Sequence, residues 1–224
     1  MSTDWKQLFQ EHGAIWMHDG RPSRPHALLT SGLHSDGFVN CTFVTQRPEL
    51  VRRIVSEPDG LAASFPREVG QASSLSDGQD ARPTLKADWV IGSAFGAITL
   101  AYAVAERLGV RAGFTEKDGE GMKLARFEVA PGEKVLVVED TLSTGGSTLK
   151  TIAALRQAGV ADSDILPCII CLVNRSGFTA LSGRQIRALI TTNIHTWPAD
   201  SCPLCKAGSA AVRPKAHWKE LTEK

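Results

Sequence analysis

The sequence predicts an α/β protein built on one mostly parallel, twisted sheet that is flanked by helices. Two observations support this prediction. From residue 89 onward, short apolar runs rich in β-branched residues alternate with longer segments of helical periodicity, which is the pattern of strands joined by crossover helices. In addition, 224 residues with 42% hydrophobic residues can bury one ordinary core but not two generous ones. We therefore expect one α/β domain with small additions, and ligands at the carboxyl ends of its strands.

The first 88 residues are less regular. Apolar residues at helical spacing predict a helix over residues 5–16 and another over residues 48–55, with short irregular strands between them. From residue 56 to about residue 88 the composition shifts to Pro, Gly, Ser, Asp and Gln, which leaves too little apolar surface to offset the entropy of ordering. We predict a polar, partly mobile insertion there, whose middle at about residues 70–81 is cut first by proteases.

The remaining elements follow in regular alternation. The run VLVV at residues 135–138 is typical of a parallel strand that is buried on both faces. The expected order is a strand at 89–92, a helix at 97–108, a strand at 111–114, a glycine-rich loop, a strand at 134–139, a helix at 147–158, a strand at 165–173 and a weaker strand at 187–192.

Charge and composition exclude several classes of function. The chain has 25 Lys and Arg against 24 Asp and Glu, so a net charge of +1 favours binding to neither nucleic acid nor an anionic membrane. The N-terminal segment has acids and no uninterrupted apolar core, and no stretch approaches the roughly 20 apolar residues of a membrane span. Five cysteines do not resemble a secreted disulfide framework. We expect a soluble, cytoplasmic protein.

The most informative segment is VLVVEDTLSTGGST at residues 135–148. It places small hydroxyl and glycine residues between the end of a strand and the start of a helix, where backbone amides favour phosphate. There is no lysine between Lys134 and Lys150, which excludes a P-loop, and no G-x-G-x-x-G fingerprint is present. Glu139 and Asp140 would repel a phosphate, so we expect them to face sugar hydroxyls or a metal ion of the same ligand.

An ordinary strand-to-helix turn would explain this segment without a ligand. However, the order of apolar strand, Glu-Asp and T-x-S-T-G-G-S resembles the thirteen-residue signature of the type I phosphoribosyltransferases, which bind 5-phosphoribosyl-1-pyrophosphate (PRPP). The resemblance implies that the loop holds the 5-phosphate, that the two acids contact the ribose hydroxyls, and that a second loop, GSAFGA, holds the pyrophosphate and contains a peptide of unusual conformation. The residues implied to bind PRPP are Glu139, Asp140, Thr141, Leu142, Ser143, Thr144, Gly145, Gly146, Ser147, Ser93, Ala94, Phe95, Lys117 and Arg126.

Further segments resemble the orotate branch of that family. ALLTSGLHSDGF is similar to its L-K-S-G-x-x-S-P-Y-F segment, and CLVNRSG is similar to its V-D-R-x-x-G. The loop FTEKDGEGMKLARFEVAPGEK and the tail CPLCKAGSAAVRPK resemble those of a Thermus-type group within the branch, so the match runs from about Leu28 to Lys215. Three departures stand out: Thr30 replaces a lysine, Asp36–Gly37 replace Pro-Tyr, and the usual mobile R-K-x-x-K-x-H-G loop is missing.

This resemblance implies the fold of the type I phosphoribosyltransferases, with a small hood built from both ends of the chain. It also implies a homodimer. We expect residues 1–55 to form the N-terminal hood segment, residues 56–88 the insertion, residues 89–194 the phosphoribosyltransferase core, and residues 195–224 a C-terminal tail with the CPLC motif.

The implied activity is the transfer of 5-phosphoribosyl from PRPP to orotate, which gives orotidine 5-monophosphate and pyrophosphate in pyrimidine nucleotide biosynthesis. The implied cofactor is Mg²⁺, held mainly through substrate oxygens. Two alternatives stay open because of Thr30 and the shortened loop. One is a phosphoribosyltransferase for a purine or another base, and the other is a non-catalytic regulator that senses PRPP or a nucleotide.

Arg175 is the residue expected to recognise the base. Orotate differs from uracil by a carboxylate, which an arginine at a strand's carboxyl end can bind with two parallel hydrogen bonds, although a solvated surface arginine is the simpler reading. The base site implied by the resemblance comprises Arg175, Thr144, Ser31 and Gly32, and the catalytic residues comprise Asp140, Glu139, Lys117 and Lys123. Together with Arg126, the two lysines lie in a loop that we expect to close over the leaving pyrophosphate.

The cysteines fall into two groups. Cys168 and Cys171 lie in an apolar strand, where positions three apart point to opposite faces, so we expect both in the core. Cys202 and Cys205 flank Pro-Leu in a polar tail and supply half of a zinc site, with His195 and His217 nearby in the sequence. Because a single C-x-x-C pair is weak evidence, we expect a packed, reduced tail, and a zinc site and redox chemistry are the alternatives for this second pair.

Overall fold

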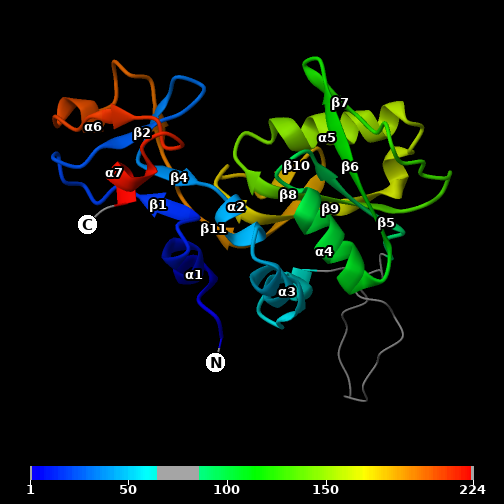
Figure 1. The fold of residues 1–224 in the computed structure, drawn as a ribbon. Coiled ribbons are helices and arrows are strands. Elements are labelled where there is room, and N and C mark those ends of the chain that lie inside the picture. Colours follow the sequence, from blue (N-terminus) through cyan, green and yellow to red (C-terminus); the bar gives the residue numbers. More distant parts are fainter. Residues whose placement is uncertain (1, 65–85, 223–224) are drawn as a thin grey trace, which may run out of the picture.

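The chain folds around one seven-stranded sheet with the order β10-β11-β9-β8-β5-β6-β7 (Figure 1). The computed structural model describes residues 2–64 and 86–222, so the predicted mobile segment at 70–81 lies outside the described residues. Neighbouring central strands pair in parallel, and the edge strands pair antiparallel, which confirms the predicted sheet. The strands are β5 (Trp89–Ser93), β6 (Arg111–Asp118), β7 (Gly121–Lys123), β8 (Val135–Leu142), β9 (Ile165–Asn174), β10 (Ala180–Leu181) and β11 (Arg184–Thr191).

Helices cover both faces of this sheet. On one face lie α3 (Pro48–Ser56) and α4 (Ile98–Leu108), and on the other lies α5 (Gly146–Gln157) (Figure 1). Side chains alternate along β8, so Leu136 and Val138 belong to the core cluster under α4, whereas Val135 and Val137 belong to the cluster under α5. Both faces of the strand are therefore buried, as its continuous apolar run predicts.

The two cysteines of β9 obey the same alternation. Cys168 and Cys171 are 1% and 0% exposed, and they belong to the clusters on opposite faces of the sheet. The prediction that both are core residues is confirmed.

Two elements differ from the prediction. The first helix, α1 (Trp5–Glu11), is shorter than 5–16, because Gly13 turns the chain with a φ of +73° and residues 15–17 form β1 (Ile15–Met17). The strand predicted at 111–114 continues to Asp118 and turns at Gly119, where φ is +55°, into β7. The first half of the predicted glycine-rich loop is thus a β-hairpin.

A smaller lobe stands beside the main sheet, and we call it the hood (Figure 1). Its four-stranded sheet has the order β12-β3-β2-β13 and joins the two ends of the chain. The hood comprises β1, β2 (His26–Leu28), β3 (His34–Ser35), β4 (Gly37–Val39), β12 (Thr196–Trp197), α6 (Pro203–Lys206), β13 (Ala211–Val212) and α7 (Trp218–Thr222). The short helix α2 (Thr42–Thr45) and the 3₁₀ turns at Leu61–Ser64 and Asp162–Asp164 complete the described elements.

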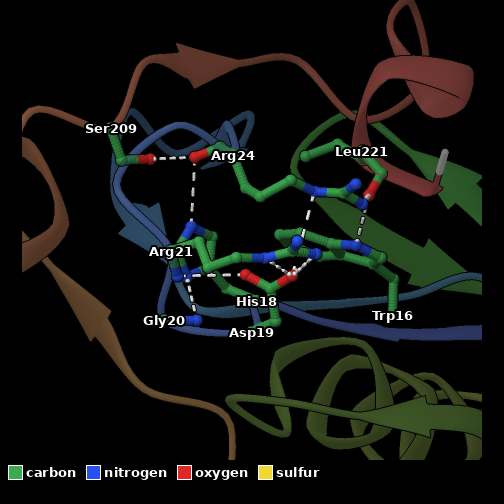
Figure 2. Close-up of polar contacts among 8 residues, drawn as sticks. All are labelled: Trp16, His18, Asp19, Gly20, Arg21, Arg24, Ser209 and Leu221. Carbon is green, nitrogen blue, oxygen red and sulfur yellow. Dashed lines mark hydrogen bonds and ion pairs between the residues drawn. The ribbon is translucent and has the colours of Figure 1, made fainter. Parts of the chain in front are cut away.

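Polar contacts join the N-terminal part of the hood to its C-terminal part. The indole Nε1 of Trp16 and the guanidinium of Arg24 both donate to the carbonyl of Leu221, at 2.7 and 3.0 Å (Figure 2). The Ser209 hydroxyl donates to the carbonyl of Arg24 at 2.6 Å, and His18 Nε2 lies 3.1 Å from the same carbonyl. Among the described residues, no helix is long and apolar enough to cross a membrane.

Candidate active site

The candidate site lies where the carboxyl ends of β5 and β8 meet. These strands are parallel neighbours, with Gly92 beside Val138, so the loops that follow them emerge side by side. A Cβ atom on Gly96 would lie 2.5 Å from Asp140 Oδ2, which shows how closely the two loops approach. The structure thus brings together the two segments that the sequence predicts to hold phosphate and pyrophosphate. The peptide between Ala94 and Phe95 in the first of them is cis.

The loop at residues 143–147 has the geometry of an anion site. Gly145 caps α5 in the left-handed conformation, with φ of +78°, and a Cβ there would lie 2.8 Å from Leu181 Cδ2. The backbone amides of Ser143, Thr144 and Gly145 donate no hydrogen bond to any described residue. Since these amides precede a twelve-residue helix, its dipole adds to their attraction for a negative charge.

Glu139 and Asp140 occupy different environments. Glu139 is 4% exposed and points into the interior, where Ser93 Oγ donates to both of its carboxylate oxygens, at 2.7 and 2.8 Å. Thr148 Oγ1, in the first turn of α5, lies 3.3 Å away as a further donor. Burial and the neighbouring Asp140 raise the pKa of Glu139 to about 8. The structure therefore places Glu139 in the interior beside Asp140, and its implied contact with the ribose stays a prediction.

Asp140 is the acid that faces the loops. It is partly exposed, its Oδ1 accepts from the amide of Thr141 at 2.7 Å, and its Oδ2 adjoins Gly96. Cys41 was not predicted from the sequence to belong to the site. Its sulfur lies 3.2 Å from Thr141 Oγ1, next to Asp140 in the chain. Burial raises the pKa of the Cys41 thiol, so it stays protonated and can donate to Thr141.

Arg175 follows β9 directly and borders the phosphate loop. Its amide donates to the carbonyl of Leu142 at 2.9 Å, which fixes the backbone beside the end of β8. Its Nε is buried and has no hydrogen-bond partner, and no carboxylate among the described residues pairs with its guanidinium. Burial lowers the pKa of Arg175. The Nε of Arg184 also lacks a partner, but the Nη2 of the same guanidinium forms an ion pair with Asp162 at 2.8 Å. Arg175 therefore offers a partly buried positive charge without a protein counter-ion.

The remaining residues of the predicted base site lie on separate parts of the molecule. Ser31 and Gly32 form the exposed turn between β2 and β3 in the hood, with φ of +82° at Gly32, whereas Thr144 is exposed in the phosphate loop. No hydrogen bond or ion pair joins this turn to Arg175 or Thr144 within the described part of the chain.

Of the predicted pyrophosphate cations, Lys117 and Lys123 lie in the β6–β7 hairpin beside α5, and Arg126 follows the hairpin (Figure 1). Lys123 pairs with Asp118 at 3.5 Å and Arg126 with Glu116 at 3.2 Å, and all four side chains are at least a quarter exposed. Exposed pairs of this kind contribute little to stability, so a more highly charged ligand can displace them. Lys117 is exposed and makes no ion pair among the described residues.

Two departures from the orotate motif have a structural reason. Asp36 accepts hydrogen bonds from both the amide and Nδ1 of His195, each at 2.8 Å, and so fastens the C-terminal tail to the hood. Gly37 has no room for a side chain, because a Cβ there would lie 2.8 Å from Met17 Sδ and 3.0 Å from Ile194. The hood thus packs tightly around Gly37 and uses Asp36 as a hydrogen-bond acceptor for the tail.

Solved structures with a similar fold define the class. An orotate phosphoribosyltransferase from Aeropyrum pernix matches with a TM-score of 0.56 at 21% identity, over 83% of this chain and 92% of that one. Orotate phosphoribosyltransferase of Mycobacterium tuberculosis, in complex with Fe(III) dicitrate, matches with a TM-score of 0.55 at 21% identity, over 84% of this chain and 97% of that one. The fold is that of the type I phosphoribosyltransferases.

Curated relatives narrow the class to a family, although no family model matches the chain. Orotate phosphoribosyltransferase of Acidithiobacillus ferrooxidans is 36% identical over 202 residues, which cover 90% of this chain and 93% of the relative. That of Desulforamulus reducens is 37% identical over 201 residues, which cover 89% and 93%. This chain belongs to the orotate phosphoribosyltransferase family.

Proposed function

We propose that this chain is an orotate phosphoribosyltransferase, which transfers the 5-phosphoribosyl group of PRPP to orotate and releases pyrophosphate. The relatives are named for this activity, and they are similar to the chain along nearly its whole length. One observation supports orotate as the base. The guanidinium of Arg175 lies beside the phosphate loop, and its buried Nε has no hydrogen-bond partner among the described residues. A planar fork of donors in that position matches the carboxylate of orotate.

The loop after β8 holds the 5-phosphate in this proposal. Its unpaired amides and the hydroxyls of Ser143, Thr144 and Ser147 surround the start of α5, so both hydrogen bonds and the helix dipole stabilise the phosphate. Gly145 is required because its φ of +78° and the nearby Leu181 both oppose a side chain. The loop thereby fixes the ribose relative to the incoming base.

Asp140 acts on the ribose. In this proposal its carboxylate accepts hydrogen bonds from the ribose hydroxyls and stabilises the positive charge that develops on the sugar as pyrophosphate departs. Glu139 supports it from behind as a positioning residue, because its bonds to Ser93 and Thr148 hold the two ligand loops and the start of α5 together. No covalent nucleophile is needed.

The residues present fit a magnesium ion that comes with the substrate. Asp140 has one carboxylate oxygen, Oδ2, that accepts no hydrogen bond from the described residues, and Mg²⁺ usually takes one or two carboxylates and otherwise phosphate oxygens and water. When bound, the ion supplies positive charge to the leaving pyrophosphate.

The hairpin and the hood complete the proposed site. Lys117, Lys123 and Arg126 neutralise the pyrophosphate when the β6–β7 hairpin moves toward the loops, and Lys117 already lacks an ion-pair partner among the described residues. The turn that carries Ser31 and Gly32 approaches the base from the hood. We further propose a cytoplasmic homodimer, on the strength of the family resemblance.

One incubation series tests the proposal. Purified protein is mixed with PRPP and Mg²⁺, and in turn with orotate, uracil, adenine, hypoxanthine or guanine, while pyrophosphate and nucleotide are measured. We expect orotidine 5-monophosphate from orotate and no comparable product from the other bases. Turnover with a purine, or no turnover with any base, would contradict the proposal.

A further inference from the structure

Four side chains from opposite ends of the chain meet inside the hood. They are His26, His34, Cys202 and Cys205, and their potential ligand atoms all lie within 4.8 Å of one another. His26 and Cys202 are fully buried, His34 is 7% exposed, and Cys205 is partly exposed. Within residues 2–64 and 86–222, no other group of three or more His, Cys, Asp or Glu side chains converges in this way.

The distances within this cluster suit a tetrahedral metal ion. His26 Nε2 lies 2.9 Å from His34 Nδ1, 3.5 Å from Cys205 Sγ and 3.7 Å from Cys202 Sγ, and the distance from Cys205 Sγ to His34 Nδ1 is 3.2 Å. Zinc bonds of about 2.3 Å to sulfur and about 2.0 Å to nitrogen would place tetrahedral ligand atoms roughly 3.3 to 3.8 Å apart. Small shifts would therefore admit the ion.

The backbone brings these four residues to one place. Leu28 pairs with His34 across the β2–β3 hairpin, so His26 and His34 are diagonal neighbours on the same face of the hood sheet. Cys202 caps the short helix α6 and Cys205 follows three positions later, which puts both sulfurs on one side of that helix.

A neighbouring hydroxyl determines which nitrogen of His26 carries a lone pair. Ser209 has one hydroxyl proton, and it donates that proton to the carbonyl of Arg24 at 2.6 Å (Figure 2). Since Ser209 Oγ also lies 2.8 Å from His26 Nδ1, the ring must donate there through Nδ1–H. The unprotonated nitrogen is then Nε2, which faces His34 and the two sulfurs. Metal-binding histidines are oriented by the same kind of second hydrogen bond.

Hydrogen bonds alone do not satisfy this cluster. The Nε2 lone pair of His26 can accept one strong hydrogen bond, yet His34 Nδ1 and the sulfurs of Cys202 and Cys205 all lie within 3.7 Å of it. A cation at the centre uses all four ligand atoms, and the two thiols release their protons when it binds.

We propose that His26, His34, Cys202 and Cys205 bind one structural Zn²⁺ ion that cross-links the N-terminal hairpin to the C-terminal tail. A closed set of two thiolates and two imidazoles is typical of a structural zinc site and leaves no position for a substrate. The two histidines flank the turn that carries Ser31 and Gly32, so the ion also fixes that turn. Any effect of the ion on base binding through this turn rests on the proposed function, whereas the metal site itself does not.

The test uses the full chain, expressed with zinc in the medium and purified under reducing conditions. We expect one zinc per chain by elemental analysis. Exchange for Co²⁺ should give the visible absorption of a tetrahedral ion together with thiolate-to-cobalt charge-transfer bands. Cys205→Ser should lose both signals, whereas His217→Ala, which changes an exposed histidine of the same tail, should keep them. Ser209→Ala should weaken zinc binding about 10- to 100-fold in a competition with a chromophoric chelator, while the protein stays folded.

Several outcomes would overturn the proposal. In the first, the reduced wild-type chain takes up neither Zn²⁺ nor Co²⁺. In the second, Cys205→Ser binds zinc as well as the wild type does. In the third, the isolated protein contains a Cys202–Cys205 disulfide. A folded Cys205→Ser that contains no zinc, alongside His217→Ala that contains one, would support it. None of these measurements depends on turnover, so failure of the proposed enzymatic function would leave the result unaffected.

Discussion

Ser93 donates hydrogen bonds to both carboxylate oxygens of Glu139, and this contact ties the end of β5 to the end of β8. The loops that follow these two strands therefore share a buried support. Ser93→Ala leaves the carboxyl of Glu139 with fewer donors in the interior, so we expect a loss of about 1–3 kcal/mol in the free energy of unfolding. Chemical denaturation measures this loss. The exposed Ser201→Ala is the control and should change stability by less than about 0.5 kcal/mol.

The pKa of Glu139 makes stability depend on pH. It is about 8 in the folded protein, against an ordinary value of 4.5, so between these values the folded state binds a proton that the unfolded state lacks. Stability from this group is complete below about pH 4.5 and is lost as the pH rises through about 8. Glu139→Gln cannot ionise and should show a shallower fall. Urea titrations at fixed ionic strength measure the two slopes, and parallel slopes would contradict the assignment.

Asp140→Asn should remove charge stabilisation at the ribose while it keeps the shape of the side chain. We expect kcat to fall roughly 100- to 1000-fold, as when one group that stabilises the transition state is removed. The melting temperature should change little, because Asp140 is partly exposed. Steady-state kinetics and thermal unfolding check both parts. Asp200→Asn, at an exposed position of the tail, is the matched control.

Arg175→Ala decides the base assignment. Removal of a bidentate, charge-assisted contact should weaken orotate binding about 30- to 1000-fold, whereas PRPP affinity should barely move. Arg175→Lys restores the charge without the planar fork, so it should recover only part of the loss. The exposed Arg156→Ala serves as the control. Separate titrations with each ligand give the answer, and equal weakening of both would count against the assignment.

Gly96→Ala tests the close approach of the two loops. The added methyl group would lie 2.5 Å from Asp140 Oδ2, so the carboxylate must shift or the loop must move. Because orientation errors of this size impair catalysis, we expect kcat to fall at least 10-fold, with the protein still folded. Single-turnover kinetics alongside circular dichroism measure both. Unchanged turnover would show that Asp140 need not lie where the structure places it.

The order of strand, loop and helix at the candidate site could be predicted because its signals are local. The strand, the two acids, the glycine loop and the start of α5 form one contiguous segment, so apolar periodicity and loop chemistry predict their order directly. The alternation of side chains along β8 also determines which way the two acids point. Residues two apart on a strand share a face, so Glu139 follows Val137 toward α5, whereas Asp140 follows Val138.

Contacts between distant segments were not predictable in this way. The two histidines that lie near the tail cysteines in the sequence have other partners: His195 pairs with Asp36 and His217 with Glu220. The histidines that meet the cysteines lie about 170 to 180 positions earlier, on a hairpin whose register no local pattern fixes. The contact of Gly96 with Asp140 likewise depends on which strands become neighbours.

The parallel pairing of β2 with β13 also sets the order in which a newly made chain can mature. His26 and Ser209 are 183 positions apart, so the hairpin emerges from the ribosome long before the strand and hydroxyl that complete its surroundings. The seven-stranded sheet can assemble first, because its last strand ends at Thr191. A chain that ends before residue 211 can therefore form the loop after β8 but not the complete hood, which makes the hood the last part of the fold to be completed during synthesis.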